Sequence, residues 1–192
     1  MHPTRSIVLA SASPRRRELL AGAGFAFEVA RPDVDETVRE GESPSSLVSR
    51  LSLEKARAVL ARRPDSVIVA ADTVVVAEGQ VLGKPRDEAD AARMLRALSG
   101  RTHEVWTGVS ILGGADEPAI VVCTRVVFRE LDDEEIARYA AGGEPMDKAG
   151  AYAIQGGAAG FVARIEGSYT NVVGLPLAET VEALRQLGCR AG

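Results

Sequence analysis

Short apolar runs bounded by polar, glycine or proline residues recur along the chain, a pattern typical of buried β-strands. We expect strands over residues 6–10, 25–30, 66–71, 74–77, 81–82, 105–112 and 119–128. Asp72 and Thr73 stand between the third and fourth of these runs, so the pattern predicts an interruption there. Glu78-Gly79 and Gly113-Gly114 carry turn signals and predict two hairpins.

Amphipathic segments that follow a capping residue predict the helices. Ser13-Pro14 and Ser43-Pro44 combine a capping hydroxyl with a proline suited to the first helical position, and Asp87 and Asp132 cap two more segments. Glycines end three of these helices, at Gly22, Gly100 and Gly142. The remaining helix carries an apolar stripe that includes Leu47, Leu51, Ala58 and Leu60, and a closing helix is expected over 177–187. The glycine-rich stretch 148–173 predicts short strands and loops.

Hairpins mixed with helices, rather than a strict strand–helix alternation, indicate an α/β fold with a mixed sheet. The chain has 192 residues, and no repeat, low-complexity segment or linker divides it. Since domains commonly hold about 150 residues, we expect a single domain over 1–192.

Composition excludes several classes of protein. A hydrophobic content of 46% with 26% charged residues is too apolar for a disordered chain. Two cysteines offer neither a disulfide framework nor a paired zinc motif. The sequence has no apolar run of about 18 residues and no secretory signal, so we expect a cytoplasmic protein without a membrane partner. The net charge of −4 argues against a nucleic-acid polymer as partner.

Lysine is scarce. Of the 23 lysines and arginines, only Lys55, Lys84 and Lys148 are lysines. The preference for arginine resembles a general coding bias. A lysine retained against that bias can mark a place where a compact ammonium is needed. The alternative is that three lysines survived by chance.

The strand–turn–helix at residues 11–17 is a candidate anion site. A helix N-terminus presents unpaired amides and a partial positive charge, and Ser11, Arg15 and Arg16 add a hydroxyl and two guanidinium groups. Three arginines in a first turn oppose the helix dipole, which suggests that an anion binds there. The alternative is an ordinary capped helix with solvated arginines.

Carboxylates supply a second group of candidates. Asp72 follows a buried apolar run, so it must be hydrogen-bonded, bind a metal ion or lie in a cleft, where it could also activate water. Asp33, Asp35 and Glu36 crowd one loop and could offer oxygens to Mg²⁺. The alternatives are an Asx turn and a solvated loop.

Three further segments have both a functional and an ordinary interpretation. Lys84, in Gly83-Lys84-Pro85, could bind phosphate, although Pro85 replaces the Ser or Thr of a P-loop. Lys55 lies in the middle of a helix and could be a surface residue. Gln155-Gly156-Gly157 could admit a ligand close to the backbone or form a turn. No catalytic triad or Cys/His pair is visible, so the residues favour metal-assisted attack of water on a phosphate anhydride.

Seven separated motifs occur in an order that resembles the Maf family of nucleoside triphosphate pyrophosphatases, and together they cover nearly the whole chain. They are Ser11-Ala12-Ser13-Pro14-Arg15-Arg16, Glu36, Glu54-Lys55-Ala56, Ala71-Asp72-Thr73-Val74, Gly83-Lys84-Pro85-Arg86, 147–156 and 167–177. The resemblance implies a mixed, twisted sheet with flanking helices, in two lobes around a cleft, as in the inosine triphosphatases. It also implies hydrolysis of a nucleoside triphosphate to monophosphate and pyrophosphate with Mg²⁺ or Mn²⁺.

The resemblance assigns roles residue by residue. Asp72 matches the general base, and Glu36, Lys55 and Lys84 match the other catalytic positions. Glu36 and Asp72 are the expected metal ligands. Substrate binding is assigned to Ser11, Arg15, Arg16, Thr73 and Gln155, of which Arg15, Thr73 and Gln155 fall where the family selects the base.

The motifs resemble the branch that acts on dTTP and UTP, because Arg15 directly follows Pro14 where the 7-methyl-GTP branch inserts a tyrosine. Three alternatives stay open: a 7-methyl-GTP-type pyrophosphatase, a hydrolase that releases orthophosphate, and a non-catalytic nucleotide-binding regulator of cell division. The sequence leaves the choice between monomer and homodimer open.

Overall fold

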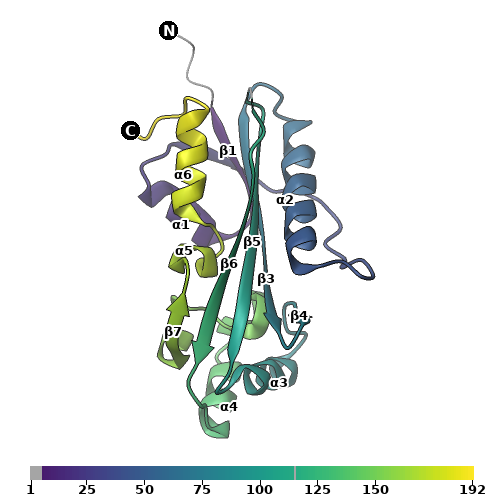
Figure 1. The fold of residues 1–192 in the computed structure, drawn as a ribbon, viewed down its shortest axis with the longest axis vertical. Coiled ribbons are helices and arrows are strands. Elements are labelled where there is room, and N and C mark those ends of the chain that lie inside the picture. Colours follow the sequence, from purple (N-terminus) through teal and green to yellow (C-terminus); the bar gives the residue numbers. More distant parts are fainter. Residues whose placement is uncertain (1–5, 115) are drawn as a thin grey trace. The chain divides into compact units, whose positions relative to one another are not determined.

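The computed structural model describes residues 6–114 and 116–192 and has a mixed α/β fold (Figure 1). The strands are β1 Ile7–Ala10, β2 Phe27–Ala30, β3 Val67–Ala77, β4 Gln80–Leu82, β5 Thr102–Leu112, β6 Ala119–Phe128 and β7 Val162–Glu166. The helices are α1 Pro14–Gly22, α2 Pro44–Leu60, α3 Glu88–Leu98, α4 Asp133–Ala141, α5 Tyr169–Val173 and α6 Leu177–Gln186. The four expected caps Ser13, Ser43, Asp87 and Asp132 are confirmed.

The described strands form one sheet in the order β2-β1-β3-β5-β6-β7, with β4 paired to β3. Strand β1 runs parallel to β2 and β3, whereas the pairs β3–β4 and β6–β7 are antiparallel. The prediction of a mixed sheet is therefore confirmed.

The predicted interruption at Asp72 and Thr73 is wrong, because β3 continues through both residues to Ala77. A strand tolerates a polar residue when that side chain has a partner on its own face of the sheet. Asp72 has such a partner in Lys55. The apolar pattern alone does not reveal a partner that lies in another segment of the chain.

The chain divides into two compact units. The first holds the described residues up to Asp72, together with Thr107–Val122 and Gly174–Gly192, and the second holds Thr73–Trp106 and Cys123–Val173. The chain passes from one unit to the other within β3, β5 and β6.

The first unit buries both faces of its strands, since successive side chains point to opposite sides of a sheet. Leu9 and Val69 belong to one apolar cluster, which includes Leu20 of α1 and Leu184 of α6. The alternate strand residues, such as Ile68, pack in a second cluster with Ala56 and Val59 of α2. Helices α1 and α6 thus cover one face and α2 the other, as Figure 1 shows.

Helix α2 packs unusually close to β5. A side chain at Gly108 would collide with the Val48 carbonyl, and the hydroxyls of Ser52 and Ser110 are hydrogen-bonded at 2.9 Å. The buried face of α2 therefore includes polar positions as well as apolar ones. It consists of Leu47, Val48, Leu51, Ser52, Lys55, Ala56 and Val59, whereas Ala58 and Leu60 of the predicted stripe are half-buried.

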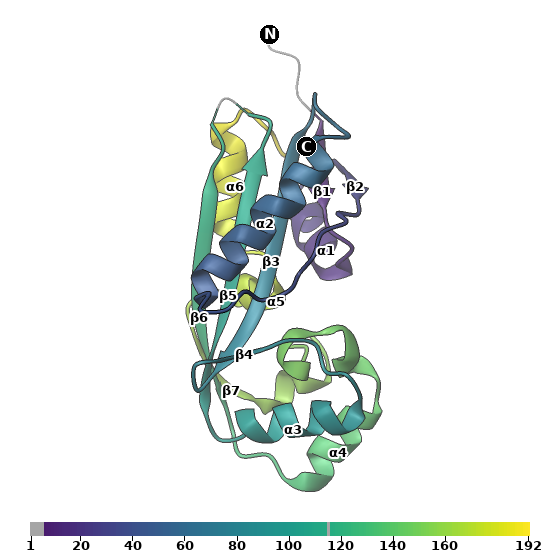
Figure 2. The same ribbon diagram turned by 90° about the vertical axis from the view of Figure 1, so that its right-hand side faces the viewer.

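In the second unit, α3 packs against α4 (Figure 2). Ala91 and Met94 of α3 meet Ala140 of α4 and Ala151 in a small apolar cluster. The glycine-rich stretch begins with a 3₁₀ turn over Ala149–Ala151, and a second such turn, Gly157–Phe161, leads into β7. A third 3₁₀ turn, Glu144–Asp147, lies just before the glycine-rich stretch.

His103 lies in the core of the second unit among aromatic side chains. Its Nε2 is 2.9 Å from the Tyr152 hydroxyl, and its ring contacts Phe128 edge to face with centroids 4.9 Å apart. No hydrogen-bond partner is found for Nδ1 among the described residues. Burial lowers the pKa of His103 from 6.5 to about 4, because the charged imidazolium would lose its hydration.

This shift predicts a pH-dependent stability. Between pH 6.5 and about 4 the unfolded chain binds a proton at His103 that the folded protein does not, so the free energy of unfolding falls as the pH is lowered. The loss over this range amounts to about 3 kcal/mol at most, at 1.36 kcal/mol per unit. Urea unfolding at several pH values should show a shallower dependence for His103→Gln. Equal slopes for the two proteins would contradict the assignment.

None of the described helices combines the length and hydropathy of a segment that could span a bilayer.

Candidate active site

The buried ion pair between Lys55 and Asp72 is the centre of the candidate site. Lys55 Nζ lies 2.5 Å from Asp72 Oδ1, and the two residues are only 6% and 7% exposed. Because α2 packs so closely on the sheet, the ammonium at its buried face reaches the carboxylate on β3. The interpretation of Lys55 as a surface residue is therefore wrong.

Glu36 is the second carboxylate on the same ammonium. Its Oε1 lies 2.6 Å from Lys55 Nζ, while about half of its side chain, 52%, stays exposed to solvent. Lys55 thus joins a buried acid from β3 to an accessible acid from the loop between β2 and α2. Of the candidates Asp33, Asp35 and Glu36, Glu36 is the one that reaches this ammonium.

Arg50, five residues before Lys55 on α2, fixes the loop that carries Glu36. Its guanidinium makes two hydrogen bonds to Glu42, at 2.6 and 2.7 Å, and a third to the Thr37 carbonyl at 3.1 Å. The paired guanidinium lowers the pKa of Glu42 to about 2. Glu54 accepts a further bond from Arg50 at 3.2 Å. The acidic loop is therefore tied to the helix at both sides of residues 38–41.

Arg16 joins the N-terminal turn of α1 to β3 and to the segment just before α6. Its Nε donates to the Gly174 carbonyl at 2.7 Å and its Nη1 to the Ala71 carbonyl at 2.8 Å. Burial lowers the pKa of Arg16 below its ordinary value, an effect that the negative charge of Asp72 opposes. A guanidinium stays protonated in proteins, so a fixed positive charge stands beside Asp72.

The start of α1 also offers anion-binding groups. Ser13 caps the helix, and the buried Ser11 accepts a hydrogen bond from the Ser13 amide at 3.1 Å. The Arg15 side chain, half-buried, makes no hydrogen bond or ion pair with another described residue. Since no acidic residue stands in the first turn of α1, the positive end of the helix dipole is not neutralised there. This arrangement can bind phosphate oxygens.

Three predicted site residues belong to the second unit and are described within it. Thr73 is a half-buried residue of β3. Lys84 is exposed and forms no ion pair with the described part of the chain, and its turn is held by a hydrogen bond from the Gly150 amide to the Gly83 carbonyl at 3.0 Å. Gln155 is exposed and lies on a separate turn, between Ala153 and Gly156.

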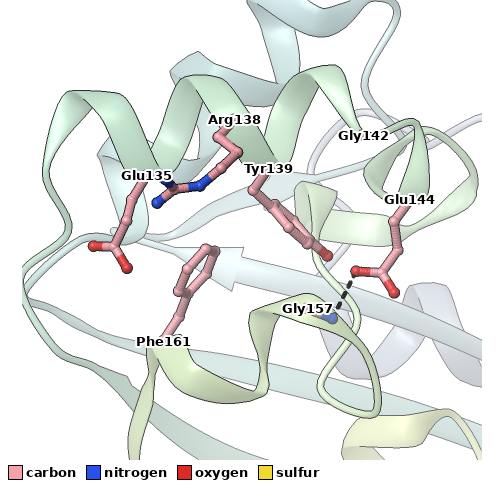
Figure 3. Close-up of a pocket in the computed structure, with 7 residues that line it drawn as sticks. All are labelled: Glu135, Arg138, Tyr139, Gly142, Glu144, Gly157 and Phe161. Carbon is pink, nitrogen blue, oxygen red and sulfur yellow. Dashed lines mark hydrogen bonds between the residues drawn. The ribbon is translucent and has the colours of Figure 1, made fainter.

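A pocket of about 390 Å³ also lies in the second unit, between α4 and the segment after Gln155 (Figure 3). Its walls include Tyr139, Glu144, Gly157 and Phe161. The rings of Tyr139 and Phe161 meet edge to face with centroids 5.2 Å apart. Figure 3 shows Glu144 pointing toward the Gly157 amide, to which it is hydrogen-bonded.

Glu36 and Asp72 fit a magnesium or manganese site of the two-carboxylate kind. In the described part of the chain, no three carboxylate, imidazole or thiol side chains gather as a cage for a cation. Mg²⁺ commonly takes one or two protein carboxylates and completes its shell with water and substrate phosphates. Glu36 and Asp72 are two carboxylates that could take part in such a site, although both are paired with Lys55 here.

Sequence reasoning missed the residues that hold the site in place. Arg50 and Glu54 stand at i and i+4 on one helix, a spacing that signals an ion pair, but their link to the acidic loop depends on the fold. The acceptor of Arg16 at Gly174 is a backbone carbonyl and leaves no mark on the sequence.

The sequence profile of a family described as Maf-like protein matches residues 6–187. A protein of Geobacter sulfurreducens named dTTP/UTP pyrophosphatase is 57% identical over 184 residues, which cover 95% of this chain and 96% of the relative. Proteins with the same name from Geotalea uraniireducens and Hahella chejuensis are 54% and 52% identical over 190 and 189 residues. These alignments cover 98% and 97% of this chain, and 98% and 94% of those relatives.

Proposed function

The chain belongs to the Maf-like family, and from this premise we propose that it hydrolyses dTTP and UTP to the nucleoside monophosphate and pyrophosphate. The observation that carries the proposal is the buried Lys55–Asp72 pair with Glu36 on the same ammonium. Relatives that are 52–57% identical and bear the name dTTP/UTP pyrophosphatase support the substrate class.

Asp72 is the proposed general base. Lys55 engages Oδ1, whereas Oδ2 accepts no hydrogen bond from a described residue. Oδ2 can therefore take a proton from water as the water oxygen attacks the α-phosphorus. The bond between that phosphorus and the bridging oxygen breaks, and pyrophosphate leaves with the electron pair. Each atom is accounted for without a covalent intermediate on the protein.

The other site residues bind and orient the substrate in this proposal. The amides at the start of α1, with Ser11, Arg15 and Arg16, hold phosphate oxygens. Lys55 keeps the two carboxylates in place, and Lys84 contributes a point charge to phosphate. Thr73 and Gln155 read the base, since an amide side chain offers both a donor and an acceptor to a pyrimidine edge.

Glu36 and Asp72 are the side chains that would hold a divalent cation. When bound, Mg²⁺ or Mn²⁺ neutralises phosphate charge and makes the phosphorus a better electrophile. The described cluster itself is balanced, because Arg16 and Lys55 offset Glu36 and Asp72. A divalent cation would add to the positive charges of Arg15 and Lys84 in offsetting a bound triphosphate, which supports the expected metal dependence.

Product analysis tests the proposal. We expect purified protein with Mg²⁺ or Mn²⁺ to release pyrophosphate and monophosphate from dTTP and UTP, and a chelator to abolish turnover. CTP, GTP, ATP and 7-methyl-GTP serve as competing substrates. Preference for 7-methyl-GTP would overturn the substrate assignment, orthophosphate as the product would indicate another hydrolase, and binding without turnover would favour a regulator.

The expected partner is the free nucleotide in the cytoplasm, rather than a nucleic-acid polymer or a membrane. Cell fractionation tests the location. Light scattering on the purified protein decides between the monomer and the homodimer that the sequence leaves open.

A further inference from the structure

We infer that Glu144 and Tyr139 are positioning residues for Gln155, and that they thereby set the selectivity between pyrimidine and purine nucleotides. The inference rests on the proposed function, because it assigns base reading to Gln155. It adds two residues outside the predicted site, both on the walls of the pocket in Figure 3.

Glu144 holds the chain on the C-terminal side of Gln155. Its Oε2 accepts a hydrogen bond from the Gly157 amide at 3.0 Å. The carboxylate also packs on Gly156 so closely that a Cβ at this position would overlap it. A side chain at 156 would displace the Glu144 carboxylate, whereas glycine lets this carboxylate hold the backbone directly after Gln155.

Tyr139 holds the chain on the N-terminal side. Its hydroxyl accepts a hydrogen bond from the Ala153 amide at 3.0 Å. The same ring packs beside Gly157, where an added Cβ would approach it to 3.1 Å, and against Phe161. One side chain of α4 thus contacts the segment both before and after Gln155.

The segment between these two anchors is a tight turn. The Gly156 amide donates to the Ala153 carbonyl at 3.0 Å, which closes a turn with Ile154 and Gln155 at its centre. Ile154 is buried, whereas Gln155 is exposed. With both ends of the turn anchored, the backbone of Gln155 is fixed, and so is the point from which its side chain extends.

The backbone of Glu144 is in turn held by Lys148. The Lys148 ammonium donates to the Glu144 carbonyl at 2.8 Å and pairs with Asp147. This contact gives the third scarce lysine a role in the support of the turn. The anchor is therefore a connected set of contacts, running from Lys148 through Glu144 to Gly157.

Base selection by an amide depends on such support, because its donor and acceptor discriminate only when they face the matching edge of the base. A displacement of about 1 Å in a supporting element can cost up to about 100-fold in rate. Loosening the turn should therefore weaken binding of the preferred base and leave the proton transfer at Asp72 intact.

The test compares Glu144→Ala, Tyr139→Phe and Glu144→Gln with the unchanged enzyme. For Glu144→Ala and Tyr139→Phe we expect a rise of about tenfold in KM for dTTP, with kcat changed less than about threefold, and the preference for dTTP over GTP reduced about tenfold. Glu144→Gln keeps an oxygen acceptor and should restore most of the preference. Glu134→Ala, an exposed position on α4, the helix of Tyr139, is the matched control and should behave as the unchanged enzyme.

Hydrogen exchange at the amides of residues 156–157 provides a readout that does not depend on turnover. Exchange should become faster in Glu144→Ala and stay slow in Glu144→Gln. Unchanged exchange, or an unchanged dTTP preference despite faster exchange, would overturn the inference. If the unchanged enzyme failed to cleave dTTP and UTP, the proposed function would fall by itself, and exchange would still decide whether Glu144 fixes the turn.

Discussion

Replacing Asp72 by asparagine is expected to lower kcat for dTTP by about 10²- to 10⁴-fold, the range for loss of a general base. The asparagine side chain has nearly the same shape and can still accept a hydrogen bond from Lys55. It cannot take up the proton of the attacking water at Oδ2. Steady-state kinetics at saturating metal ion provide the measurement.

Two controls separate chemistry from folding in this experiment. Thermal unfolding of Asp72→Asn should stay cooperative, because Glu36 remains as a partner for the buried ammonium. Asp65→Asn, an exposed residue two positions before β3, should retain the turnover of the unchanged enzyme. Full turnover by Asp72→Asn would show that another group activates the water.

Replacing Lys55 by methionine is expected to lower the free energy of unfolding by about 3 kcal/mol, because it leaves a buried carboxylate without its partner. Asp72 is only 7% exposed, so water cannot fully replace the ammonium. Arg16 reduces the loss by its positive charge nearby. Urea unfolding near neutral pH measures the effect.

The double variant Lys55→Met with Asp72→Asn tests the cause of that loss. Removing the orphaned charge should recover about 1–2 kcal/mol relative to Lys55→Met alone. Strict additivity of the two single changes would indicate that the destabilisation comes from lost packing of the lysine stem and not from the charge.

Local signals in the sequence are sufficient for most elements of this fold. Each of the four capping residues begins a helix where predicted, since an N-cap acts through amides only two or three residues away. The mixed sheet follows from hairpins such as the one between β3 and β4. These features depend on neighbours in the chain, which the sequence displays directly.

The features that could not be predicted depend on contacts between distant segments. Asp72 continues a strand because Lys55, from another element, satisfies it. Lys55 is buried because Gly108 lets α2 approach the sheet, a fact that the helix sequence does not contain. Asp72 and Lys55 were recognised as candidates from their residue types and motifs, but the geometry that joins them comes from the fold.

The hydrogen bond between Arg16 and Gly174 has a consequence for synthesis of the protein on the ribosome. The two residues are 158 positions apart in the sequence. The Arg16 guanidinium can therefore make this bond only after nearly the whole chain has left the ribosome. Such distant closures form late in folding, because loop entropy must be lost first. An unfinished chain would carry the N-terminal turn of α1, the proposed phosphate site, without this anchor. A nascent chain should therefore leave cellular nucleotides intact until translation is almost complete.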